Sequence, residues 1–313
     1  MSLSSSQRVF AVVINWNGGD GNLTCLRALV GAGFDPEHVV FVDNASTDGS
    51  SQVVMKRFSG MTYIRNSSNK GFAEAANQGA ERALQTGADW VFFINNDLEL
   101  APRSLETLLQ KAAWDGQIGA LAPRILMPGN PPRIWAAGMR ERFGPNVVQL
   151  IGHKKVDGPK FQFTKEVTHL TGAALLIRRQ ALEDVGGFEP SYFAYMEDVD
   201  LCARLGRADW KMLHVGEASA VHDASGSTGG GYSARRKYML GLNTVLYLKR
   251  NGGMVAWSRF FVCDVCAWPL VFVAALPSGN GKSAIAKALG LLHGFFGKRV
   301  QAKTVEPGGT WLW

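Results

Sequence analysis

The chain of 313 residues is long enough to bury a sizeable core, and its hydrophobic content of 46% excludes an intrinsically disordered protein. Its four cysteines are too few and too scattered for a disulfide framework, which favours a reducing compartment. The net charge of +7 resides at the end of the chain: residues 231–313 contain 11 Lys and Arg against two acids, whereas residues 1–230 contain 22 against 24. We therefore expect a domain over 1–230 and a basic extension over 231–313.

Strand and helix patterns alternate along the first hundred residues. Short apolar runs predict strands, and segments with apolar residues at helical spacing predict the helices between them. The expected strands are 8–16, 38–46, 61–66 and 90–100, and the expected helices are 23–33, 50–58 and 73–87. This β-α-β order predicts a doubly wound, parallel, Rossmann-like α/β sheet. The glycine-rich segment 225–233 reads as a mobile loop and as the boundary to the extension.

The strand at 90–100 contains five consecutive apolar residues and then changes to Asn95, Asn96 and Asp97. An uninterrupted apolar run suits a strand covered on both faces, and ligands of open α/β sheets bind beyond the carboxyl ends of such strands. Asp97 is therefore a candidate ligand-binding residue. The alternative is that Asp97 only caps the helix expected to begin near Pro102.

Polar residues also follow the first two strands, with Asn15 and Asn17 after one and Asp43 and Asn44 after the other. The carboxyl ends of parallel strands share one edge of the sheet, so these groups should converge with Asp97. An aspartate such as Asp43 can accept the imide N–H of uracil or thymine, and Asp97 can hold a pyrophosphate through a divalent cation. The pattern predicts a nucleotide-diphosphate site. No GxGxxG follows the first strand, which argues against a dinucleotide-binding oxidoreductase.

Several motifs occur in a fixed order along the chain. They are VVINWNG, VVFVDNASTDGS, NKGFAEAANQG, FFINNDLEL, TGAALLIRRQALEDVGGFEPSYFAYMEDVDLCAR and AVHDASGST. Together they resemble the motifs of family 2 glycosyltransferases with the GT-A fold, especially bacterial rhamnosyltransferase-like members, over about residues 9–250. The usual Asp-x-Asp is replaced here by Asn95, Asn96 and Asp97, so that only the last acid is present.

The resemblance implies a donor site and a metal site. The metal, Mg²⁺ or Mn²⁺, is expected at Asp97 and His222, because His222 ends a short apolar segment and neutral imidazole suits Mn²⁺ well. A structural histidine is the alternative. The residues expected to bind the donor nucleotide sugar are Asn15, Trp16, Asn17, Asp43, Asn44, Lys70, Gly71, Asn77, Asn95 and Asn96.

Three acids, Glu197, Asp198 and Asp200, lie in the segment YFAYMEDVDLCARL, close to the start of a predicted helix. An inverting transfer needs one carboxylate to take a proton from the acceptor hydroxyl, and the Glu197-Asp198 pair resembles the family's Glu-Asp motif, in which the second acid is the base. We expect Asp198 to be the base, with Glu197 beside it, and Asp200 to pair with Arg204 along the helix. The alternative is that these acids only stabilise the helix dipole.

The extension contains the longest apolar stretch, residues 260–276, which is interrupted by Asp264 and Pro269 and is marginal for crossing a bilayer. Behind it, Ile285, Leu289, Leu292 and Phe296 recur at helical spacing, with Lys and Arg residues on both sides. We expect the apolar stretch to lie on a membrane surface rather than span it. For the amphipathic segment, packing on the protein's own core is an equal alternative. Nucleic-acid binding is disfavoured because the charges form no dense run.

These features predict an inverting, metal-dependent glycosyltransferase that uses a dTDP- or UDP-sugar, with dTDP-rhamnose the preferred donor. The expected acceptor is a glycan or lipid-linked glycan of cell-surface polysaccharide synthesis. The N-terminus lacks the length and basic flank of a signal peptide, so the expected location is the cytoplasmic face of the inner membrane. The alternatives are a nucleotidyltransferase of sugar-nucleotide synthesis and a non-catalytic module that binds glycans or membranes.

Overall fold

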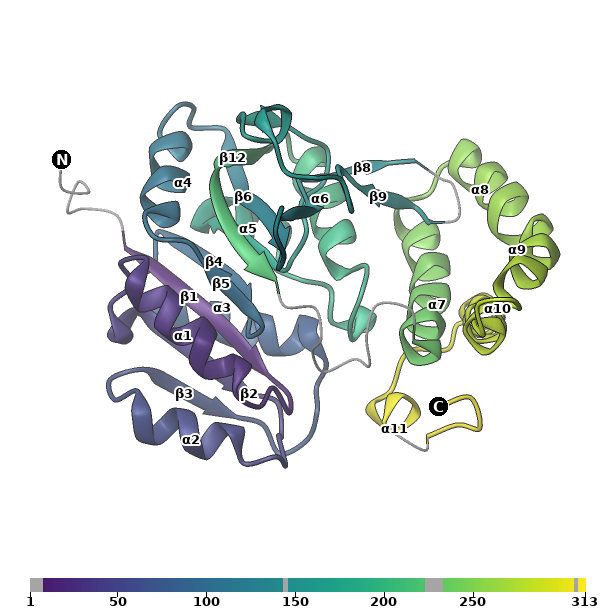
Figure 1. The fold of residues 1–313 in the computed structure, drawn as a ribbon, viewed down its shortest axis with the longest axis horizontal. Helices are drawn as coiled ribbons and strands as arrows, with labels where there is room; N and C mark the ends of the chain where they lie inside the picture. The colour runs from purple at the N-terminus through teal and green to yellow at the C-terminus, as the bar shows by residue number, and fades with distance from the viewer. Residues whose placement is uncertain (1–7, 143–145, 223–232, 307–308) are drawn as a thin grey trace.

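The computed structural model describes residues 8–142, 146–222, 233–306 and 309–313 (Figure 1). The strands and helices expected within the first hundred residues are present, except that the strand expected over 90–100 is divided at Asn96 and Asp97 into two strands, Trp90–Asn95 and Leu98–Leu100. The glycine-rich segment 225–233 lies outside the described residues except for Ser233. The strands are β1 (Val9–Asn15), β2 (Val39–Asp43), β3 (Thr62–Arg65), β4 (Trp90–Asn95), β5 (Leu98–Leu100), β6 (Ile118–Met127), β7 (Arg133–Ala136), β8 (Met139–Glu141), β9 (Val148–Leu150), β10 (Lys165–Glu166), β11 (Ala174–Arg178) and β12 (Lys211–His222).

The helices differ widely in length, from short turns to the 18 residues of α7. The α-helices are α1 (Gly21–Gly31), α2 (Ser50–Arg57), α3 (Phe72–Gln85), α4 (Ser104–Ala112), α5 (Arg179–Val185), α6 (Glu197–Arg207), α7 (Ala234–Asn251), α8 (Met254–Phe260), α9 (Trp268–Ala275), α10 (Gly281–Phe295) and α11 (Ala302–Val305). Shorter turns are η1 (Pro36–His38), η2 (Pro159–Phe161) and η3 (Pro190–Tyr192), and the π-helical segment η4 (Phe261–Cys266) joins α8 to α9.

The main sheet has ten strands, with the order β10-β12-β6-β11-β4-β1-β2-β3 along its path. The four strands β3, β2, β1 and β4 are parallel, as the alternating pattern predicts. In contrast, β11 is antiparallel to both β4 and β6, so the sheet is mixed rather than wholly parallel. The reason is that the chain enters β11 at the edge where β4 ends, and the Asn95 N–H donates to the Ala173 carbonyl there.

Two hydrophobic clusters lie on the two faces of this sheet. On one face, Ala11 and Val13 of β1 pack with Leu26 of α1 and Leu108 of α4. On the other face, apolar residues of β1, β2 and β4 pack against the alanine-rich side of α3 and the apolar sides of α5 and α6. This arrangement of helices on both faces of a buried sheet fixes the strand ends in space, so polar residues that follow the strands are held at one edge.

The C-terminal helices form a group beside the sheet domain (Figure 1). Helix α10 packs closely on α7 because a glycine of each helix faces the backbone of the other: a Cβ at Gly290 would lie 2.1 Å from the Tyr238 carbonyl oxygen, and one at Gly241 2.3 Å from that of Lys287. Helix α10 therefore packs on the protein's own core through small residues such as Ala286 and Gly290, together with the buried Leu291 and the partly buried Ile285 and Leu289. Of the predicted apolar stripe, Leu292 and Phe296 remain 52% and 77% exposed.

No single helix in the described parts of the chain is long and apolar enough to cross a membrane. The pair Met254–Cys266 and Trp268–Ala275, bent by 42°, meets the length and composition requirements when taken together.

Candidate active site

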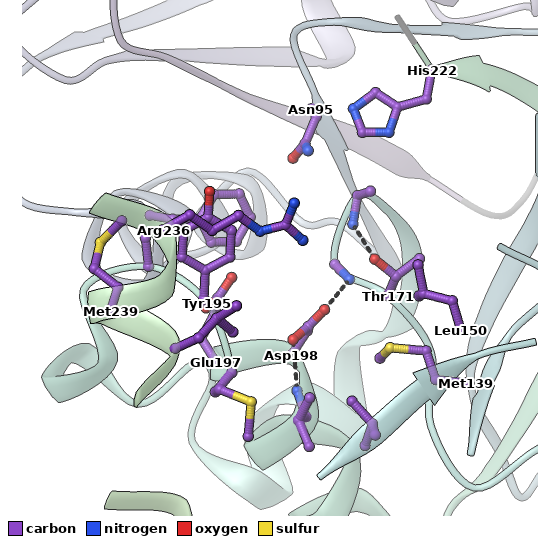
Figure 2. A pocket seen from close by; sticks show the side chains of 18 of the residues that line it. Asn95, Met139, Leu150, Thr171, Tyr195, Glu197, Asp198, His222, Arg236 and Met239 are labelled. Atoms are coloured by element: carbon purple, nitrogen blue, oxygen red, sulfur yellow. Dashed lines mark hydrogen bonds between the residues drawn. The ribbon is translucent and has the colours of Figure 1, made fainter. Parts of the chain in front are cut away.

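A cavity of about 1060 Å³ opens at the carboxyl ends of β1 and β4 and extends to the start of α6, the first turns of α7 and the β8–β9 hairpin. Figure 2 shows that His222 and Asn95 lie at one end of the view and Glu197 and Asp198 at the other. The predicted site residues that line this cavity are Trp16, Asn44, Gly71, Asn95, Asn96, Asp97, Glu197, Asp198 and His222. Residues more than 200 positions apart in the sequence thus share one wall.

A buried network of amides and hydroxyls supports the strand ends. The Asn15 side chain is fully buried, and its Nδ2 lies 3.0 to 3.3 Å from oxygens of Asp43, Ser46, Ser50 and Ser51. Its Oδ1 accepts hydrogen bonds from the Asn96 and Asn22 amides and from the Gly18 N–H. Asn15 therefore joins the ends of β1, β2 and β4 and acts on the cavity from behind its wall rather than from within it.

Asn44 shapes the neighbouring part of the wall. Its Oδ1 accepts from the Lys70 backbone N–H at 2.9 Å, and its Nδ2 donates to the Asn69 Oδ1 at 2.9 Å and to the Gly71 carbonyl at 3.1 Å. These bonds fix the loop that leads into α3. Gly71 has φ +82°, and an added Cβ would lie 2.5 Å from the Phe193 carbonyl oxygen, so only glycine fits.

Five of the predicted donor-binding residues lie outside the cavity lining, among them Asn15. Asp43 is fully buried, with its carboxylate 3.4 Å from the Tyr63 hydroxyl and 3.7 Å from the Arg65 Nε. The Asn77 Nδ2 donates to the Phe188 carbonyl, and the Asn77 Oδ1 accepts from the Phe188 N–H. These two bonds join α3 to the segment before α6. The other two are surface residues: Asn17 accepts from the Thr47 N–H, and the Lys70 ammonium lies 3.8 Å from Glu74.

Asp97 and His222 meet at the strand-end side of the cavity. The His222 Nε2 lies 3.1 Å from the Asp97 Oδ1, and the Trp135 ring packs edge-on against the imidazole. His222 is held there because β12 pairs with β5, which directly follows Asp97. The Asp97 Oδ1 and the His222 Nδ1 are buried, and apart from the contact between these two side chains neither atom has a hydrogen-bond partner among the described residues. Helix α4 begins at Ser104, and its N-cap residue is Arg103, so Asp97 is not the cap of that helix.

The turn before α6 has an unusual backbone. Phe193, Tyr195 and Met196 have φ values of +58°, +67° and +73°, a region that side-chain-bearing residues rarely occupy. Asn243 of α7 holds this turn: its buried Nδ2 lies 2.8 Å from each of the carbonyl oxygens of Tyr192, Ala194 and Tyr195. The strained turn places the next two residues, Glu197 and Asp198, at the cavity wall.

Glu197 and Asp198 differ in their surroundings. The Asp198 carboxylate accepts from the Gly172 N–H at 2.9 Å and the Val199 N–H at 2.8 Å, whereas the Glu197 Oε2 is buried and has no partner in the described parts of the chain. Burial raises the pKa of both, and the neighbouring Asp198 charge raises that of Glu197 further. The two N–H donors offset part of the rise in the pKa of Asp198. Asp198 is therefore the acid that ionises first, and Glu197 is the one that keeps its proton.

The helix pair predicted from the sequence also forms. The Arg204 Nε lies 2.7 Å from the Asp200 Oδ2, and Asp200 further accepts from the Tyr192 hydroxyl and the Asn251 amide. This buried acid therefore ties α6 to the strained turn and to α7.

The sequence interpretation missed the part of the cavity wall that α7 provides. Arg235, Arg236 and Lys237 line it from the first turn of the helix. In the sequence these residues only contribute to the charge of the basic end. Thr171 and Gly172 were also missed as site residues, although they begin one of the motifs that carry the family resemblance.

A half-sheet of parallel strands with a cavity at its strand ends, facing a carboxylate pair at a helix start, has the architecture of the GT-A glycosyltransferases. The model of glycosyl transferase family 2 matches residues 11–186. The protein belongs to this family and is a glycosyltransferase. Both alternatives, a nucleotidyltransferase and a non-catalytic binding module, are thereby disfavoured.

Among curated proteins, the chain is similar to the N-acetylglucosaminyl-diphospho-decaprenol L-rhamnosyltransferase of Mycobacterium tuberculosis. The two are 34% identical over 214 residues, which are 62% of this chain and 69% of that enzyme.

Two solved structures share the fold. The mannosyltransferase PcManGT of Pyrobaculum calidifontis, solved with GDP-Man and Mn²⁺, has a TM-score of 0.60 and 15% identity, with 94% of this chain and 89% of that chain covered. GalNAc-T7, solved with UDP, GalNAc and Mn²⁺, has a TM-score of 0.58 and 14% identity, with 79% and 51% covered, so this chain spans about half of its length.

Proposed function

We propose that the protein transfers a sugar, rhamnose in our preferred assignment, from a dTDP- or UDP-sugar to a lipid-linked acceptor in cell-surface glycan synthesis, with inversion at the anomeric carbon. The observation that carries this proposal is that one cavity has His222, with Asp97 in contact with it, on one side and Asp198 on the other. The similarity to an L-rhamnosyltransferase whose name includes a lipid diphosphate supports both the donor and the acceptor class.

The donor nucleotide is assigned to the strand-end half of the cavity, where Trp16, Asn44, Gly71, Asn95 and Asn96 line the wall. Asn15, Asn17, Asp43, Lys70 and Asn77 would act from behind or beside this wall. Asp43 remains our candidate for pyrimidine recognition, because its carboxylate lies directly before Asn44 at the end of β2. To reach a base, this carboxylate must replace one of its present neighbours, Tyr63 or Arg65, with the imide N–H.

A divalent cation, Mn²⁺ or Mg²⁺, is assigned to Asp97 and His222. The two residues fit a metal because the Asp97 Oδ1 and the His222 Nε2 lie 3.1 Å apart, and the buried Oδ1 has no other polar partner among the described residues. Two protein ligands suffice when substrate phosphates supply others, and an imidazole ligand favours Mn²⁺. A bound cation would supply charge neutralisation for the departing nucleoside diphosphate.

Asp198 is assigned as the general base. Burial raises its pKa, which strengthens it as a base, while the N–H groups of Gly172 and Val199 keep its charged form accessible. Glu197, with a pKa raised further, would hold its proton and donate a hydrogen bond to the acceptor. The acceptor hydroxyl is thus deprotonated by one acid and oriented by the other, and no covalent intermediate is required.

We also assign the exposed apolar side of the extension to the cytoplasmic surface of an anionic membrane. Phe261, Val262, Leu270 and Val273 are between 54% and 75% exposed along η4 and α9. Basic residues of the same extension, which carries a net charge of +9, would meet anionic headgroups. The proposed division remains a catalytic domain over 1–230 and an extension over 231–313, although α7 of the extension lines the cavity.

The experiment that tests the function is a transfer assay with a panel of nucleotide sugars and an N-acetylglucosaminyl-diphospho-isoprenoid acceptor, with product detected by mass spectrometry. We expect a deoxyhexose to be transferred from dTDP-rhamnose in the presence of Mn²⁺ or Mg²⁺. Transfer from a purine-nucleotide sugar alone would refute the donor assignment.

A further inference from the structure

Consecutive cationic residues of α7 face the active-site cavity. The Arg235 guanidinium lies over the Trp16 ring at 5.9 Å, on the strand-end side, and the Arg236 guanidinium lies over the Tyr195 ring at 5.3 Å. Figure 2 shows the Arg236 side chain extending past Tyr195 toward the space between Asn95 and Asp198. Tyr195 belongs to the strained turn that carries the catalytic pair, so Arg236 is positioned by the same turn as the base.

Apolar side chains also line the cavity, both beside Arg236 and across from it. Figure 2 shows Met239 of α7 on the same side as Arg236, and Met139 and Leu150 of the β8–β9 hairpin on the opposite side, beyond Asp198. Methionine side chains are flexible and polarizable, and they fit irregular apolar ligands well. A guanidinium next to such a wall and next to the catalytic carboxylates fits an amphiphilic ligand with an anionic head and an apolar chain.

The electrostatics of this wall favour an anion. The pKa of Lys237 is lowered to about 8, first by burial and then by the positive charges of Lys287 and Arg236. Asp264, which forms an ion pair with Lys287, offsets part of this shift, and an anionic ligand near Arg236 would relieve the repulsion that remains. A diphosphate ester carries the charge and the planar oxygen geometry that a guanidinium binds through two parallel hydrogen bonds.

We propose that Arg236 binds the diphosphate of a lipid-diphosphate-linked sugar acceptor, with the apolar side chains of Met139, Leu150 and Met239 in contact with the start of its isoprenoid chain. This inference rests on the proposed function and specifies its acceptor class. Two substrates that each carry a diphosphate need separate cationic sites because their charges repel. The diphosphate of the donor is assigned to the metal held by Asp97 and His222. The diphosphate of the acceptor is assigned to Arg236, on the side of the cavity where Asp198 lies.

The test compares two acceptors that contain the same sugar. One is a short-chain N-acetylglucosaminyl-diphospho-isoprenoid, and the other is octyl N-acetylglucosaminide, which has an apolar chain but no diphosphate. Both are assayed in detergent with the full chain as wild type, Arg236→Ala and Arg236→Lys. The matched control is Arg27→Ala, which removes an exposed arginine of α1 outside the cavity.

Arg236→Ala should lower kcat/KM for the diphosphate acceptor about 10- to 100-fold, the range of a charge-assisted hydrogen-bond pair, and leave the octyl glycoside within about 2-fold. Arg236→Lys should recover part of the loss, because it keeps the charge but not the planar fork. Arg27→Ala should match wild type on both acceptors.

Three results would overturn the inference while the proposed function stands. The first is an equal loss on both acceptors, the second is no loss on either, and the third is a raised donor KM with unchanged acceptor kinetics, which would assign Arg236 to the leaving diphosphate. If the wild type transfers sugar to neither acceptor from any donor, the proposed function itself fails. Should Arg236→Ala not fold, Arg236→Lys and Arg236→Gln decide by the same ratio of the two acceptors.

Discussion

Replacing Asn243 with alanine should damage catalysis from a position outside the cavity lining. The Asn243 Nδ2 lies 2.8 Å from three carbonyl oxygens of the turn that precedes α6. An amide has only two N–H groups, so at most two strong bonds form at once, and their loss should cost about 1 to 3 kcal/mol of stability. Three residues of this turn have positive φ values, each costing about 1 to 3 kcal/mol, so the turn should relax once its donor is removed.

Relaxation of the turn would displace Glu197 and Asp198. A shift of about 1 Å in a catalytic group can cost about 10²-fold in rate, so we expect kcat to fall between about 10- and 100-fold while the donor KM stays within about 2-fold. The assay combines steady-state kinetics with denaturant unfolding. The matched control is Asn251→Ala, which removes an amide of the same helix that binds Asp200 but none of the turn carbonyls. If Asn243→Ala loses stability and keeps its full kcat, the turn does not depend on this clamp and the reasoning fails.

Three further predictions concern the acids, the metal and the membrane. The pKa of Glu197 is raised above its ordinary 4.5 in the folded protein, so above pH 4.5 the folded state binds more protons than the unfolded state. Glu197 therefore destabilises the fold as the pH rises. We expect Glu197→Gln to be more stable than wild type at pH 7. Its advantage should grow by up to about 1.4 kcal/mol per pH unit and vanish near pH 4 in urea titrations, and a pH-independent difference would contradict this. In calorimetry, Asp97→Ala should abolish Mn²⁺-dependent binding of dTDP and His222→Ala should weaken it, and both variants should keep the fold. Full activity of the wild type in EDTA would refute the metal assignment. The protein should float with anionic liposomes and be released by salt. The double variant Phe261→Ser, Leu270→Ser should not float. Indifference of the wild type to anionic lipid would exclude the membrane contact.

Much of the strand-end half of the site is predictable from the sequence because its determinants are local. An apolar run that stops at Asn95 marks both the strand and its carboxyl end, and the parallel order of the first four strands then brings Asn44 and Asp97 to one edge. The same reasoning could not reveal that Asp43 lies behind the wall, because the bonds that hold it there include those from Asn15 of β1 and Tyr63 of β3, which are distant in the sequence.

The α7 side of the site depends on contacts between distant segments. Asn243 donates to carbonyls that lie 48 to 51 residues earlier in the chain. The turn that contains these carbonyls has positive φ values at residues other than glycine, and no local pattern predicts this. The packing of α10 is another case. Of the large apolar residues at helical spacing, Ile285 and Leu289 pack against the core, whereas Leu292 and Phe296 are exposed. The close approach at Gly241 and Gly290 depends on how two separate helices meet, which the local pattern does not show.

The central claim, that Asp198 is the base of an inverting sugar transfer, is tested most directly by single-turnover transfer with wild type, Asp198→Asn and Glu197→Gln. Asparagine keeps the size and polarity of Asp198 but cannot accept a proton. We predict that Asp198→Asn binds dTDP-rhamnose with wild-type affinity while its transfer rate falls about 10²- to 10⁴-fold, and that the wild-type product has the anomeric configuration opposite to that of the donor. Near-normal transfer by Asp198→Asn, or a product that retains the donor's configuration, would contradict the account.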